Sequence, residues 1–165
     1  PFWGTGGISN SMSLDAQAIA ESAMSLDMAA YSGQNLIHDI GLMGAGTIAS
    51  FELVVISDEI IAHLSRMLRG ITVDRGTVGL DAIMEAGYGG EFLALSHTRE
   101  HIGEHIQPEL YNRSNWREWL QDGGKTLEES AREKAKKLIR DAEIENPDRL
   151  KEELSSIVET AIKGP

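Results

Sequence analysis

Two adjacent polar side chains, His38 and Asp39, are the first candidates for chemistry in this sequence. They directly follow Leu36 and Ile37, at what is predicted to be the end of a buried strand. A polar pair there is costly to bury unless it is hydrogen-bonded or acts on a ligand. Because both side chains can orient a bound molecule or accept its proton, we assign them as candidate catalytic residues. The alternative is an ordinary place in a structural hydrogen-bond network.

The first 13 residues contain candidates for contacts with a ligand. Glycine, serine and asparagine are frequent in this stretch and favour a loop. Within it, Gly6 and Gly7 would let the backbone approach a bound molecule closely. Phe2 and Trp3 could line a pocket for an apolar cation, with simple aromatic packing as the alternative.

Three more residues complete the candidate ligand-binding set. Gln17 and Glu21 fall near the start of a helix that follows the loop, and Met43 lies in the glycine-rich stretch at residues 41–46. That stretch matches neither the dinucleotide-binding nor the phosphate-loop pattern of glycines. Its position matters more, because loops that follow strands form the functional face of parallel α/β folds.

A histidine pattern further along the chain raises the question of zinc. His97, Glu100 and His101 match the H-x-x-E-H motif of one class of zinc peptidases, and His105 continues the four-residue spacing. Such a site needs a further ligand and a catalytic cleft. We therefore expect a packed or solvated helix face here and no metal bound by this chain, with a zinc hydrolase as the enzymatic alternative.

Composition narrows the class of protein. With 26 acidic and 15 basic residues the formal net charge is -11, which argues against a nucleic-acid or membrane partner. The longest apolar stretch, at residues 53–61, is too short and too interrupted by charge to span a bilayer. The absence of cysteine excludes disulfides and thiolate metal sites and fits a reducing compartment, so we expect a cytoplasmic protein.

The elements that must position these residues are mostly helices. Ser13 and Thr47 are plausible N-caps, and Gly33 and Gly70 are plausible helix stops. The predicted elements are a loop at 1–13, a helix at 13–33, a strand at 35–39, a glycine-rich loop at 41–46, helices at 47–70, 78–86, 92–106 and 116–120, and two C-terminal helices that open at a Thr126 capping box and at Asn146-Pro147.

This order of elements is one passage of a parallel α/β fold. A lone strand at residues 35–39 needs parallel neighbours, which we expect upstream of this chain. The first residue is Pro1 and not an initiator methionine, which adds to the expectation that residues precede it. With one strand beside a very apolar helix, we expect the segment not to fold as an autonomous domain.

A set of short motifs stands in a specific order and spacing along nearly the whole chain. They are Gly4-Thr5-Gly6-Gly7, Asp15-Ala16-Gln17 with Glu21, Asn35-Leu36-Ile37, Ser50-Phe51-Glu52, Asp58-Glu59-Ile60-Ile61, Arg69-Gly70-Ile71, Gly87-Tyr88-Gly89-Gly90 and His97-Thr98. Together they resemble the C-terminal third of trimethylamine methyltransferases. The resemblance implies a (β/α)8 TIM barrel, whose last strand and flanking helices would occupy residues 1–70. Residues 71–165 would form a helical C-terminal extension, so the chain would be mostly helical.

The resemblance also implies a reaction, in which a methyl group passes from trimethylamine to the Co(I) of a corrinoid carried by a partner protein, as in methanogenesis from methylamines. Members of the methanogen type carry pyrrolysine at a strand end upstream of the Gly-Thr-Gly-Gly loop, which would place it before Pro1. Members without pyrrolysine act on quaternary amines such as glycine betaine. We thus expect a corrinoid protein as partner and a homo-oligomer, with a non-enzymatic helical interaction domain as the remaining alternative.

In a barrel, the carboxyl end of a strand and the preceding loop between strand and helix open on the face that bears active sites. Residues 1–13 should therefore lie beside His38 and Asp39.

Overall fold

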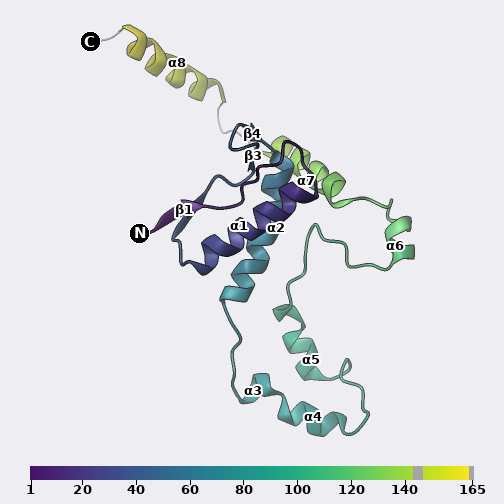
Figure 1. Ribbon diagram of the computed structural model, residues 1–165. Helices are drawn as coiled ribbons and strands as arrows, with labels where there is room; N and C mark the ends of the chain where they lie inside the picture. The colour runs from purple at the N-terminus through teal and green to yellow at the C-terminus, as the bar shows by residue number, and fades with distance from the viewer. Residues whose placement is uncertain (143–146, 164–165) are drawn as a thin grey trace.

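The computed structural model of the chain is a mostly helical α/β structure with two small sheets, and it describes residues 1–142 and 147–163 (Figure 1). In chain order the elements are β1 (Trp3–Thr5), α1 (Ala16–Tyr31), β2 (Leu36–His38), β3 (Leu42–Met43), β4 (Ile48–Ala49), α2 (Phe51–Leu68), α3 (Arg75–Val78), α4 (Leu80–Ala86), α5 (Ser96–His101), the 3-10 helix η1 (Ile102–Glu104), α6 (Trp116–Gln121), α7 (Leu127–Asp141) and α8 (Pro147–Lys163). The expected predominance of helix is confirmed.

The first sheet is a parallel pair within a strand–helix–strand unit. β1 and β2 lie side by side, with Trp3 opposite Leu36 and Thr5 opposite His38, and α1 forms the connection between them. The interpretation of residues 1–13 as a loop is therefore wrong for residues 3–5. The expectation of a lone strand is also wrong, because β2 has a parallel neighbour in this chain. Nor is β2 buried, since Leu36 is 56% exposed.

The glycine-rich stretch at residues 41–46 belongs to a hairpin and does not lead directly into a helix. β3 and β4 pair antiparallel, and Thr47 Oγ1 donates to the Gly44 carbonyl oxygen at 2.6 Å across the turn. Thr47 is thus a turn residue and not the N-cap that we predicted. The N-cap of α2 is Ser50, whose Oγ accepts a hydrogen bond from the Leu53 N–H at 3.1 Å.

The ends of α1 and α2 show which residues begin and end these helices. Asp15 accepts a hydrogen bond from the Ala18 N–H at 2.9 Å, so Asp15 and not Ser13 is the N-cap of α1. Both predicted stops are confirmed. The chain leaves α1 through Gly33 (φ 76°) and α2 through Gly70 (φ 73°), in the left-handed conformation that glycine adopts easily.

The main core lies where α1 and α7 pack on α2. Ser22 of α1 and Ser57 of α2 are fully buried, with their Oγ atoms 3.0 Å apart, so small side chains let these helices approach closely. On α7, Ala131 and Ala135 are buried in the same core. The core therefore crosses the predicted boundary at residue 70, because α7 completes the burial of a helix that precedes that boundary.

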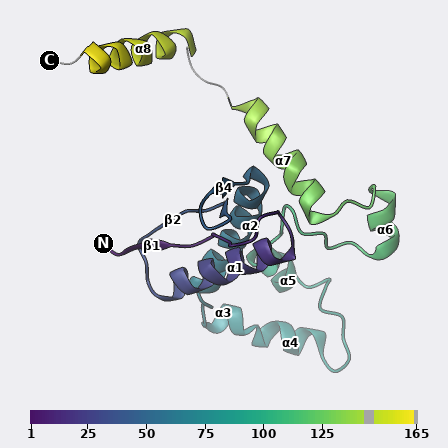
Figure 2. The same cartoon turned by 45° about the horizontal axis from the view of Figure 1, so that its top comes forward.

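Between α2 and α7 the chain makes an excursion, and we call residues 71–106 the arm. Figure 1 shows the arm helices α3, α4 and α5 set apart from α1 and α2. Figures 1 and 2 both show α8 away from the other elements. The arm contains α4, close to the predicted helix at 78–86, and also α3, which we did not predict. The predicted helix at 92–106 is shorter, because α5 ends at His101. The chain returns to the core at Leu110.

The capping box that opens α7 is confirmed. The Glu129 N–H donates to Thr126 Oγ1 at 3.2 Å, and the Thr126 N–H donates to Glu129 Oε2 at 2.8 Å. α8 begins at Pro147, while its predicted cap, Asn146, lies outside the described residues. Among the helices of residues 1–142 and 147–163, none is both long and apolar enough to cross a bilayer.

Candidate functional site

The carboxyl ends of β1 and β2 bring polar and aromatic side chains together. His38 Nδ1 lies 2.9 Å from Asp39 Oδ2, and Thr5 Oγ1 donates to the same oxygen at 3.3 Å. The indole of Trp3 meets the imidazole of His38 edge to face, with ring centroids 5.3 Å apart. We call Trp3, Thr5, His38 and Asp39 the strand-end cluster. Residues 1–13 and the pair of His38 and Asp39 therefore do lie together, as the geometric argument predicts.

Asp39 has a backbone conformation that is uncommon for residues other than glycine. Its φ of 73° lies in the left-handed region, which aspartate tolerates better than most residues because its short side chain can hydrogen-bond locally. The Asp39 carbonyl oxygen accepts a hydrogen bond from the Leu42 N–H at 3.1 Å, which closes the turn between β2 and β3. Such conformations concentrate at functional sites, and here one holds a carboxylate at the end of the sheet.

One face of the parallel sheet is open. Side chains alternate between the faces of a strand, and the middle residues Gly4 and Ile37 are less exposed than their neighbours. Ile37 packs against the main core, so Trp3 and His38 belong to the opposite face. Trp3 is 65% exposed. An exposed indole in contact with an imidazole that is paired with a carboxylate forms surroundings that attract an organic cation.

The two glycines after β1 make their close contacts within the chain itself. At Gly6 a Cβ atom would lie 2.8 Å from Ile37 Cγ2 and 3.3 Å from the Ser25 carbonyl oxygen, and the Gly6 N–H donates to the His38 carbonyl oxygen at 3.1 Å. Gly7 has a φ of 73°, and its N–H donates to Ser25 Oγ at 3.0 Å. Both glycines are buried. Packing between β1, α1 and β2 therefore accounts for glycine at both positions without a ligand.

Gln17 and Glu21 form a separate polar group on α1. Gln17 Nε2 donates to Glu21 Oε1 at 2.9 Å, and Ser9 Oγ and the Asn10 N–H each donate to Glu21 Oε2 at 2.7 Å. The Ser9 hydroxyl is the largest cause that holds the pKa of Glu21 below its ordinary value. The ionised carboxylate thus fastens the loop after β1 to α1, and these hydrogen bonds do not reach the strand-end cluster.

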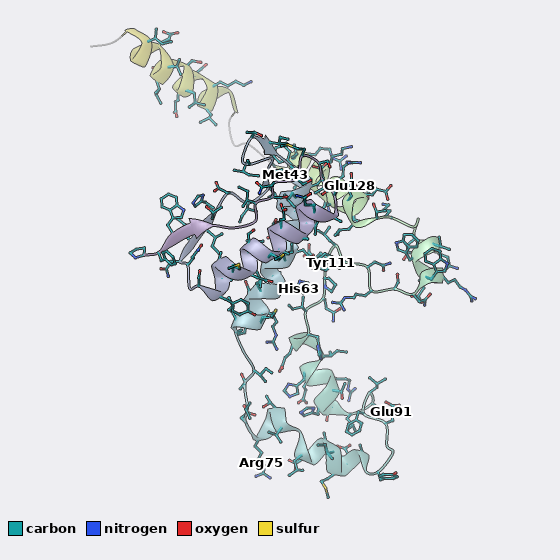
Figure 3. The ribbon with its side chains drawn as sticks, in the orientation of Figure 1. Met43, His63, Arg75, Glu91, Tyr111 and Glu128 are labelled. Carbon is teal, nitrogen blue, oxygen red and sulfur yellow. The ribbon has the colours of Figure 1, made fainter. Side chains whose placement is uncertain are left out.

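Met43 and Phe2 lie in different surroundings from the cluster. Met43, labelled in Figure 3, is 3% exposed and packs with Ala18 and Leu53 in a small second core. Phe2 is exposed and precedes β1, where its N–H donates to Asn35 Oδ1 at 2.9 Å. It therefore stands at the opposite end of the sheet from Asp39. The structure does not bring either residue to the strand-end cluster.

Comparison with known proteins shows the family to which the chain belongs. A family model described as trimethylamine methyltransferase (MTTB) matches residues 1–162. The chain belongs to the trimethylamine methyltransferase family. It is 29% identical to trimethylamine methyltransferase MttB of Methanosarcina barkeri over 165 residues, which cover 99% of this chain and 33% of that protein. Identity to MttB of Desulfitobacterium hafniense is 30% over 160 residues, or 96% of this chain and 32% of that protein.

A relative with a different substrate in its name is also similar. The glycine betaine methyltransferase of Desulfitobacterium hafniense is 35% identical over 119 residues, which cover 71% of this chain and 25% of that protein. This chain spans about a third of the length of the curated MttB relatives that it matches.

The histidines of the H-x-x-E-H pattern lie in the arm, where other groups are their partners. His97 Nε2 is hydrogen-bonded to the Gly76 carbonyl oxygen at 2.9 Å, His101 Nδ1 lies 2.6 Å from Glu104 Oε1, and the two imidazole rings are 4.4 Å apart. α5 ends at His101, so the expectation that His105 continues the same helical face is wrong. In the described part of the chain, no group of three or more histidine or acidic side chains is placed to hold a metal ion.

Thr5 is the member of the strand-end cluster that our sequence argument did not select. The composition of residues 1–13 predicts a loop, in which side-chain direction has no fixed period. In the observed strand, Trp3 and Thr5 fall on the same face by the two-residue repeat. That alternation is the signal that would have identified Thr5.

Proposed function

We propose that this chain forms part of the amine-binding site of a methyltransferase that transfers a methyl group from trimethylamine to a corrinoid on a partner protein. The observation that carries the proposal is the strand-end cluster, where the Asp39 carboxylate and the His38 imidazole meet at the carboxyl ends of two parallel strands. The exposed ring of Trp3, at the start of β1, contacts the His38 imidazole. Membership of the trimethylamine methyltransferase family supports methyl transfer as the reaction.

The chemistry of the cluster fits a methylated amine. Trp3 offers an aromatic face to a small cation surrounded by methyl groups. Asp39 provides negative charge, and Thr5 and His38 hold its carboxylate in place. When the carbon–nitrogen bond breaks, its electron pair stays on nitrogen, so a neutral tertiary amine must first gain a proton. His38, oriented by Asp39, can donate that proton and stabilise the departing amine.

The two groups that lie outside this chain have separate tasks in the proposal. The corrinoid would supply Co(I) as the methyl acceptor, and pyrrolysine, on the segment before Pro1, would help to orient the amine. The residues of this chain then need no nucleophile of their own. Their task is to bind the amine, fix its orientation and balance charge at nitrogen.

We further propose that the two strand–helix units belong to a (β/α)8 barrel. β1 with α1 and β2 with α2 follow one another, the helices cover one face of the sheet, and the other face is open. This is the arrangement of two neighbouring units in such a barrel, so the chain would contribute two strands and not one. The strand-end cluster would then lie at the carboxyl-end face, where active sites of this architecture occur.

A quaternary amine such as glycine betaine is the second candidate substrate. A glycine betaine methyltransferase shares 35% identity with this chain, against 29% for MttB of Methanosarcina barkeri. Trp3 could serve either amine, whereas the carboxylate of betaine would be repelled by Asp39. Methyl transfer to the corrinoid protein, measured with the full-length enzyme and each amine in turn, decides between the two substrates.

Replacing Asp39 with Asn tests the site. The change keeps the shape and a residue type that tolerates the left-handed conformation, but it removes the charge. We expect methyl transfer by full-length enzyme to fall by on the order of a hundredfold while the unfolding temperature changes little. Asp58→Asn, at an exposed position on α2, is the matched control. Full activity of Asp39→Asn would show that the pair of His38 and Asp39 is structural.

A further inference from the structure

A cleft with an excess of positive charge lies between the C-terminal half of α2 and the chain that returns from the arm. Its volume is about 640 Å³, and it is lined by His63 and Arg66 of α2 and by His105 and Arg113 of the returning chain. A second hollow of about 380 Å³ shares Arg66 and His105 and adds Arg69. A cluster of cations is notable in a chain with 26 acidic and only 15 basic residues.

Arg66 is fixed in place and still charged. Its Nε donates to the Glu104 carbonyl oxygen at 3.0 Å, and its Nη1 donates to the Gly70 carbonyl oxygen at 2.9 Å. Because both acceptors are neutral carbonyl groups, neither bond cancels the charge of the guanidinium. Nη2 takes part in neither bond and can donate to a ligand. An arginine that is already ordered loses little entropy when it binds an anion.

The carboxylate that lines both hollows, Glu104, is engaged with another partner. His101 Nδ1 lies 2.6 Å from Glu104 Oε1, on the arm side of the cleft. That hydrogen bond is the largest cause that holds the pKa of Glu104 below its ordinary value, and the charges of Arg66 and His105 lower it further. Glu104 is therefore ionised and offsets part of the positive charge, so the lining of the larger cleft sets two guanidinium groups, Arg66 and Arg113, against one carboxylate.

Some of the described basic residues form a salt bridge and others do not. Lys125, Arg132 and Lys134 each form a salt bridge with a glutamate. Within residues 1–142 and 147–163, Arg69 and Arg113 form none. Arg113 lines the larger cleft and Arg69 lines the smaller hollow. A guanidinium group that is not engaged in a salt bridge is suited to neutralise a bound anion.

We infer that this cleft binds a phosphate-bearing small molecule. Guanidinium groups match phosphate oxygens through paired hydrogen bonds, and several cations together favour a divalent anion over a single carboxylate. The volume of about 640 Å³ lies in the range of small-molecule sites and exceeds the needs of a free ion. Ile106 and Pro108 add an apolar wall for an organic part. An organic phosphate ester therefore fits the cleft better than inorganic phosphate.

The cleft is separate from the strand-end cluster. α2 begins beside the hairpin at Phe51, whereas His63 and Arg66 lie toward its other end. Figure 3 labels His63 on α2 and Tyr111 on the returning chain, and their ring centroids are 5.5 Å apart. A ligand in the cleft would bridge these two segments and reinforce their contact. The inference does not depend on the proposed methyl-transfer activity.

Isothermal titration calorimetry on the full-length protein tests the inference with glycerol 3-phosphate, inorganic phosphate and succinate. We expect the ester to bind more tightly than inorganic phosphate, and succinate to bind least. Arg113→Gln should weaken binding of the ester by on the order of tenfold or more, because a hydrogen bond between charged groups is lost. Arg117→Gln, at an exposed position on α6 outside the cleft, is the matched control and should leave binding unchanged.

Arg113 is the better position for the variant because Arg66 also bonds two backbone carbonyls, so its loss could disturb the fold. Unchanged binding of the ester to Arg113→Gln, or no binding of either phosphate to the unmodified protein, would overturn the inference. So would tighter binding of succinate. Inorganic phosphate that binds as tightly as the ester would overturn the assignment of an organic ligand.

Discussion

The carboxylate of Glu59 is expected to hold the chain that returns from the arm against α2. Glu59 is 6% exposed, and its Oε2 accepts hydrogen bonds from the backbone N–H groups of Glu109 at 3.0 Å and Leu110 at 3.1 Å. Leu110 is itself buried in the main core. His63 Nδ1 also lies 3.8 Å from Glu59 Oε1. A single buried carboxylate thus joins two segments that are about 50 residues apart in sequence.

Glu59→Ala would leave both N–H groups without this acceptor. A buried donor that loses its partner costs about 1–3 kcal/mol, so the free energy of unfolding should fall by about 3 kcal/mol in total. The sum stays below two full penalties because the hydrogen bond of the Glu109 N–H is only partly buried. Glu59→Gln keeps one oxygen acceptor without the charge and should cost about half as much.

Urea unfolding of the full-length protein measures these costs. Glu85→Ala, at an exposed position on α4, is the control and should stay within about 0.5 kcal/mol of the unmodified protein. Hydrogen exchange adds a local readout, because the amides of Glu109 and Leu110 should lose protection only in Glu59→Ala. Unchanged stability together with full protection of both amides would refute the reasoning.

Two further predictions concern a turn and a helix start. Gly41→Ala should lower the free energy of unfolding by about 2 kcal/mol or more, because φ is 84° and the new Cβ would overlap Val54 Cγ2. Gly46→Ala, where φ is 83° but the surroundings are open, should lower it by about 1 kcal/mol. Urea unfolding measures both changes. The hydrogen bond from the Ala18 N–H is the largest cause that holds the pKa of Asp15 below its ordinary value. The ionised Asp15 side chain therefore stabilises the folded protein fully at neutral pH, and this contribution is lost as the pH falls below about 4. Asp15→Asn should therefore be less stable at neutral pH and lose less stability on acidification, as melting temperatures across that range would show.

The helix stops could be predicted from the sequence because they depend on local conformation. Gly33 and Gly70 occupy left-handed positions that favour glycine, and the capping box at Thr126 closes within one turn. The helix starts are harder to predict from the sequence, because several residues near each start can act as N-caps. Ser13 and Asp15 are both good N-caps, and the structure uses Asp15 while the Ser13 hydroxyl lies 3.4 Å from its Oδ2.

The strands and the full site could not be predicted in the same way. β1 has only three residues, one of them Gly4, and it is a strand because it pairs with β2 across the length of α1. Such pairing is a non-local interaction that no local propensity reveals. His38 and Asp39 were identifiable because polar residues after an apolar pair stand out. Met43 was misplaced because its neighbouring glycines form a hairpin turn and not an open loop.

The open face of the β1–β2 sheet links the fold to the proposed function. Strands this short are not stable as an isolated pair, and Leu36 and Trp3 leave large apolar groups in solvent. Neighbouring strands of a barrel would satisfy the free edges of the sheet and enclose that face. The same enclosure would surround His38 and Asp39 with low-dielectric walls, in which one carboxylate attracts a cationic amine far more strongly than in water. Completion of the sheet would therefore stabilise the fold and strengthen the site at once, so the activity of the site is expected only in the full-length enzyme.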